Sequence, residues 1–123
     1  MLKFTSKVAL AVFAAAALTT SANAHPKLKS SVPAAEGAVS GAPSEIKLNF
    51  SEGVISKFCK VELMDQAGEK IILGNVATNP KDQKQLIVPL KAPLQAGTYK
   101  VVWHAVSVDT HRIDGTYSFK LRP

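Results

Sequence analysis

The chain has 123 residues, of which 46% are hydrophobic, and 15 basic residues against 9 acidic residues give it a formal net charge of +6. This length suits a single domain with a modest core. The basic residues are spread along the chain and are not interleaved with aromatic side chains, which argues against a nucleic-acid-binding protein. The only cysteine is Cys59, so an internal disulfide is excluded, and we expect this residue to be a small buried thiol in a strand.

The first 24 residues have the pattern of an export signal. Two lysines, Lys3 and Lys7, precede an unbroken apolar run over residues 8–18, and the segment ends in Ala22-Asn23-Ala24. A charged start, an apolar centre and an A-x-A site are the parts of a signal peptide. The run is shorter than the roughly 20 residues that a membrane-spanning helix needs. We therefore expect residues 1–24 to be cleaved and residues 25–123 to form the mature domain, whose net charge is +4 because the two lysines are lost.

The mature chain reads as short strands separated by turn-forming residues. Apolar and polar residues alternate in several segments, which predicts half-buried strands. These segments are residues 46–50, 61–63, 71–73, 86–90, 98–106 and 117–121. Pro89 marks an edge or the end of its strand. No stretch has a helical period, so we predict an antiparallel sandwich or Greek-key barrel in which Trp103 is a packing residue.

Three histidines carry most of the functional signal. Cleavage after Ala24 would make His25 an amino terminus, whose amine and ring nitrogen can chelate a metal together. Copper(II) suits nitrogen ligands in a tetragonal arrangement. Pro26 has no amide proton, so the peptide backbone cannot complete that arrangement and positions stay open for other ligands. Asp109 and His111 are two residues apart, and in an extended segment they would point to the same face and converge on one ion.

These residues belong to longer stretches that resemble the copper resistance protein C (CopC) family of bacterial periplasmic copper-binding proteins. The stretches are HPKLKSSVPAAEGAV, LNFSEGV, LQAGTYKVVWHAVSVDTHRIDG and TYSFKL, which span nearly the whole mature chain. The resemblance implies an immunoglobulin-like Greek-key β-barrel or sandwich of about seven antiparallel strands. It also implies one copper(II) per chain, bound by the amine and ring of His25, by Asp109 and by His111. Glu52 matches an acid that supports the metal in some members.

Two departures from the family pattern refine this expectation. Some members bind copper(I) through a methionine-rich loop, but the corresponding region here contains only Met64, which we expect to be a packing residue. One thioether cannot build a copper(I) site, so the chain resembles the copper(II)-only members. His104 stands where relatives often carry arginine, and we interpret it as a surface residue outside the site.

The leading hypothesis is a periplasmic copper(II) carrier or buffer in copper homeostasis and resistance. It would be a monomer without enzymatic activity, and the family suggests an inner-membrane copper transporter related to CopD as its partner. Two alternatives remain open at this point. An N-terminal histidine site also occurs in copper-dependent oxidative enzymes, although a carboxylate beside the metal would occupy a position that oxygen chemistry needs. The other alternative is a metal-free immunoglobulin-like adhesion or assembly module.

Overall fold

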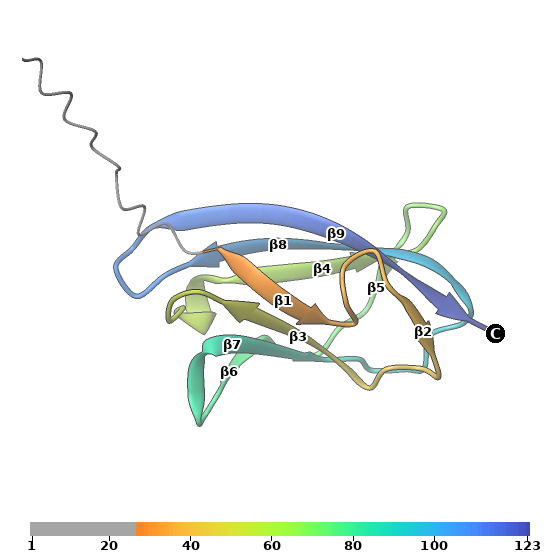
Figure 1. Ribbon diagram of the computed structural model, residues 1–123, viewed down its shortest axis with the longest axis horizontal. Coiled ribbons are helices and arrows are strands. Elements are labelled where there is room, and N and C mark those ends of the chain that lie inside the picture. The colour runs from red at the N-terminus through yellow and green to blue at the C-terminus, as the bar shows by residue number, and fades with distance from the viewer. Residues whose placement is uncertain (1–26) are drawn as a thin grey trace, which may run out of the picture.

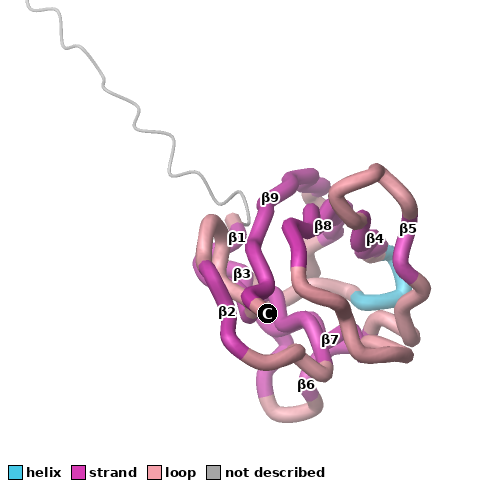
Figure 2. The backbone as a smooth tube through the Cα atoms, turned by 90° about the vertical axis from the view of Figure 1, so that its right-hand side faces the viewer, coloured by secondary structure: helices cyan, strands magenta, loops and turns pink. Residues whose placement is uncertain are grey.

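Two β-sheets pack face to face in the computed structural model, which describes residues 27–123 (Figures 1 and 2). One sheet has the order β1-β3-β7-β6, and the other has the order β2-β9-β8-β4-β5. The strands of the first sheet are β1 (Leu28–Val32), β3 (Glu45–Phe50), β7 (Asp82–Pro89) and β6 (Ala77–Asn79). Those of the second are β2 (Ala38–Ser40), β9 (Arg112–Arg122), β8 (Gly97–Val106), β4 (Lys60–Met64) and β5 (Lys70–Ile71). Residues 27–123 contain one short 3-10 helix, η1 (Ser56–Phe58), so the all-β prediction is confirmed.

The strand count and one pairing differ from the prediction. The described chain has nine strands where about seven were expected, and β2 pairs with β9 in parallel. Three strands were missed, β1, β2 and β6, and all three lie at sheet edges. In β1 only Ser31 is buried, so the segment lacks the apolar alternation that reveals a half-buried strand. Pro89 is the last residue of β7, which confirms it as a strand end.

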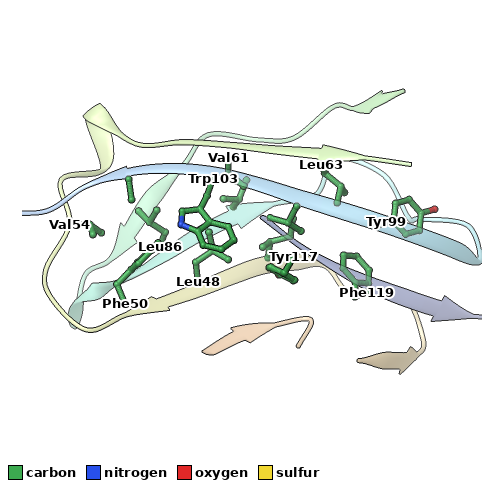
Figure 3. Close-up of a cluster of buried hydrophobic side chains, with 14 of the residues drawn as sticks. Leu48, Phe50, Val54, Val61, Leu63, Leu86, Tyr99, Trp103, Tyr117 and Phe119 are labelled. Atoms are coloured by element: carbon green, nitrogen blue, oxygen red, sulfur yellow. The ribbon is translucent and has the colours of Figure 1, made fainter. Parts of the chain in front are cut away.

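Aromatic residues of β8 and β9 form the centre of the core (Figure 3). Tyr99 stacks on Phe119 with ring centroids 5.5 Å apart, and Trp103 lies 6.1 Å from Tyr117. Trp103 is only 7% exposed, so its expected packing role is confirmed. It fits because its partner in the β8–β9 register is Gly115, where an added Cβ would lie 2.1 Å from the indole Cζ2.

Cys59 packs against the core, although not from a strand. It follows η1 directly, and its Sγ donates a hydrogen bond to the carbonyl oxygen of Ile55 at 3.2 Å. Burial raises the pKa of this thiol. Met64 is half-buried at the end of β4 and lies outside the buried core cluster. Within residues 27–123, no helix has the length and apolar character needed to span a bilayer.

Candidate metal site

The hairpin between β8 and β9 carries Asp109 and His111. The last strand pair is Val106 with Arg112, and beyond it the Ser107 N–H donates to the His111 carbonyl at 2.9 Å. The Thr110 N–H donates back to the Ser107 carbonyl at 2.9 Å, and Thr110 has a φ of 68°. A tight turn followed by a left-handed residue is typical of three-residue hairpin loops. This loop therefore places Asp109 at the tip and His111 immediately after it.

The side chains of Asp109 and His111 meet. The Nδ1 atom of His111 lies 3.0 Å from Oδ2 of Asp109, and the two side chains are 48% and 43% exposed. The other carboxylate oxygen, Oδ1, accepts a hydrogen bond from the hydroxyl of Ser107. These contacts, first the Ser107 bond and then His111, lower the pKa of Asp109, so the carboxylate is ionised at neutral pH. An ionised carboxylate beside an imidazole is a donor set that suits divalent copper.

Two other segments reach the same end of the sandwich. Figure 1 shows the start of β1 and the end of β3 at the end of the molecule that carries the β8–β9 hairpin. Lys27 and Ser51 are joined twice: the Lys27 N–H donates to Ser51 Oγ at 2.8 Å, and the Ser51 N–H donates to the Lys27 carbonyl at 2.8 Å. The Val108 N–H donates to the Gly53 carbonyl at 2.9 Å. Glu52 lies between these two anchored positions, so its backbone borders the hairpin. The residue is half-buried.

The structure brings together some of the predicted site residues. Asp109 and His111 are in contact, and Glu52 is on a neighbouring segment. His25 lies outside the described residues, so its predicted role as a ligand stays a prediction. Among residues 27–123, no group of three or more His, Cys, Asp or Glu side chains is arranged to hold a metal ion.

His104 belongs to a different pair on the outer face of the second sheet. Its Nδ1 lies 2.7 Å from Oδ1 of Asp114, its cross-strand partner, and its side chain is 48% exposed. It is thus a surface residue, as expected. The pair lines a cleft of about 610 Å³, together with Ile55, Phe58, Ala105, Val106, Thr110 and Arg112. Thr110 belongs to the hairpin loop, so the cleft adjoins the loop that carries Asp109 and His111.

Sequence reasoning missed Ser107. This residue is 0% exposed and contacts both Asp109 and His111. Ser107 precedes Asp109 by two residues, which is the same spacing that separates Asp109 from His111. The available signal was a polar residue at the base of the loop that carries the two predicted ligands.

Comparisons with known proteins agree on one family. The family profile described as "CopC domain" matches residues 28–122. Copper resistance protein C of Pseudomonas syringae pv. tomato is 41% identical over 128 residues, which cover 99% of each chain. Protein YobA of Escherichia coli K12 is 43% identical over 116 residues, which cover 94% of each chain. The crystal structure of PcoC, a methionine-rich copper resistance protein from Escherichia coli, aligns with a TM-score of 0.71 at 43% identity, covering 80% of this chain and 100% of that one.

Proposed function

Because this chain belongs to the CopC family, we propose that it is a periplasmic copper(II)-binding protein that carries or buffers copper in homeostasis and resistance. The observation that supports this most directly is the contact between Asp109 and His111 at the tip of the β8–β9 hairpin. Both side chains are about half exposed, so an ion can reach them from solvent. The names of relatives called copper resistance protein C support copper as the metal.

In the complete site, one Cu²⁺ would have four donor atoms from three residues. His25 would supply its α-amine and a ring nitrogen, Asp109 a carboxylate oxygen and His111 a ring nitrogen. This number of nitrogen and oxygen donors matches the tetragonal preference of copper(II). His25 is two residues before Lys27, which is anchored to Ser51, and two extended residues span up to about 7 Å.

Glu52 would have a supporting role in this site. Its neighbours on either side, Ser51 and Gly53, are hydrogen-bonded to Lys27 and Val108 respectively. The residue is therefore held between the segment that leads back to His25 and the segment that carries Asp109. A carboxylate here would balance the charge of the ion or bind it in one state of the site.

The family to which the chain belongs also suggests its location, the periplasm, and its partner, a membrane transporter. Removal of residues 1–24 on export would create the free amine of His25, so metal binding would depend on processing. We propose a monomer that exchanges copper with an inner-membrane transporter related to CopD. We expect no catalytic turnover, because the Asp109 carboxylate would occupy a coordination position that oxygen chemistry requires.

The processed terminus gives the sharpest test of this function. Protein that starts at His25 should bind one equivalent of Cu(II) tightly in a competition titration against a chelator. Protein with one added methionine should bind much more weakly, because its terminal amine becomes an amide. The melting temperatures of the two metal-free proteins should agree, since the sandwich begins at Leu28. Equal affinities would contradict the role of the amine.

Two histidine variants provide a matched control within the same titration. His111→Ala should weaken Cu(II) binding by at least 100-fold, whereas His104→Ala should leave it within about twofold. Both side chains are 48% exposed and both lie within 3.0 Å of a carboxylate, so the two changes are similar in kind. Equal losses would show that the hairpin is not the copper site.

A further inference from the structure

Ser107 is a fully buried polar residue at the base of the hairpin that carries Asp109 and His111. Its backbone is fixed on two sides, by the hydrogen bond to the His111 carbonyl and by a bridge to Val54. Its side chain is 0% exposed, while the two side chains that follow in the Ser-x-Asp-x-His pattern are about half exposed. Ser107 therefore connects the rigid sandwich to the groups at its surface.

The hydrogen bonds of Ser107 have a defined direction. The backbone N–H of His111 donates to Ser107 Oγ at 3.2 Å. A serine hydroxyl has one proton, and an ionised carboxylate can only accept, so that proton is donated to Oδ1 of Asp109. Oδ2 of Asp109 then faces Nδ1 of His111. Both carboxylate oxygens are thus held, one from the interior and one from the neighbouring ring.

We infer that Ser107 is a positioning residue of the copper site, whose buried hydroxyl fixes the orientation of the Asp109 carboxylate beside His111. This inference rests on the proposed function. Asp109 is on a loop tip with a 43% exposed side chain, and without the hydroxyl its carboxylate is held only by the half-exposed ring of His111. Removal of a group that orients a metal ligand typically lowers metal affinity about 10–100-fold.

The test is a double-mutant cycle in mature protein that starts at His25, with Cu(II) as the probe. Ser107→Ala should weaken Cu(II) binding about 10–100-fold and change the electron paramagnetic resonance spectrum of the bound ion. In the Asp109→Ala background the same change should have no further effect, because Ser107 acts through Asp109. An equal loss in both backgrounds would overturn the inference, since Ser107 would then act on the hairpin as a whole.

A second pair of variants covers the case in which Ser107→Ala does not fold. Ser107→Thr and Ser107→Val add side chains of nearly the same shape, and only threonine keeps the hydroxyl. The threonine variant should bind Cu(II) at least about 10-fold more tightly than the valine variant. It should also retain the wild-type electron paramagnetic resonance spectrum. Equal affinities in the pair would overturn the inference.

The proposed function and the positioning role of Ser107 can fail separately. If wild-type protein does not bind Cu(II) tightly, the proposed function is wrong and the positioning role of Ser107 falls with it. If wild-type protein binds and Asp109→Ala weakens binding, while Ser107→Ala binds as wild type, only the positioning role is wrong. Thermal melts of the metal-free variants accompany each titration, so that a loss of folded protein is recognised.

Discussion

Gly115 is the position where one added methyl group tests the packing of the core. It is paired with Trp103 across β8 and β9, and an ideal Cβ would lie 2.1, 2.5 and 2.7 Å from three indole carbons. Favourable carbon–carbon contacts lie at about 3.5–4.0 Å, so either the indole or the strand must move by more than about 1 Å. Trp103 is only 7% exposed and packs in the core, so its side chain has little room to move.

The size of the effect follows from overpacking. Extra atoms in a well-packed core typically cost about 1–3 kcal/mol, and the short contact distances place Gly115→Ala at about 3 kcal/mol. For a domain of this size, about 1 kcal/mol of stability corresponds to roughly 4–8 °C in Tm. We therefore expect the metal-free variant to melt at least about 12 °C below the wild type in differential scanning calorimetry.

Two controls test the reasoning. Thr116→Ala, at the adjacent exposed position of β9, should change the stability by no more than about 0.5 kcal/mol. In a Trp103→Phe background, Gly115→Ala should cost much less, because phenylalanine lacks the distal part of the indole that meets the new methyl group. A Tm within about 2 °C of the wild type, or the same loss in both backgrounds, would refute the steric explanation.

Three further predictions concern the hairpin, an ion pair and the metal. Thr110→Gly should raise the free energy of unfolding by about 1 kcal/mol in urea titrations. A left-handed conformation costs a non-glycine residue roughly 1–2 kcal/mol, and part of this gain is offset because glycine loses more conformational entropy on folding. The pKa of Glu62 is lowered chiefly by its hydrogen bond to Lys70. The stabilising contribution of this ion pair is therefore present above the ordinary pKa of 4.5 and is lost as pH falls through the folded pKa. The Tm difference between wild type and Glu62→Gln should shrink over the same fall in pH. Copper(I) competition titrations should find no tight site involving Met64, since one thioether cannot build one; a tight Met64-dependent site would contradict this.

How much of the structure the sequence predicts depends on where each element lies. Segments with one buried face, such as β3 and β8, have clear alternation and were predicted nearly to their ends. The edge strands were missed because exposed strands have little apolar signal, and the parallel pairing of β2 with β9 requires knowledge of the whole sheet. The contact between Asp109 and His111 was expected from an extended segment that continues the strand, but the two residues meet across a hairpin turn in which Thr110 is left-handed. The hydrogen bonds of Ser107 could not be predicted, because they depend on the loop geometry that the left-handed Thr110 creates.

The end of the sandwich that carries the hairpin is assembled from three segments far apart in the chain, and this would tie the proposed metal binding to the completion of folding. Lys27 meets Ser51, and Gly53 meets Val108, so the segments adjoin only after both sheets have formed. β9 is the last strand, and the hairpin closes only when it pairs with β8. An unfolded chain would keep only the amine and ring of His25 as donors, so copper would bind the native state more tightly than the unfolded chain. At a free copper concentration of 100 times Kd, this would stabilise the native state by at most about 2.7 kcal/mol.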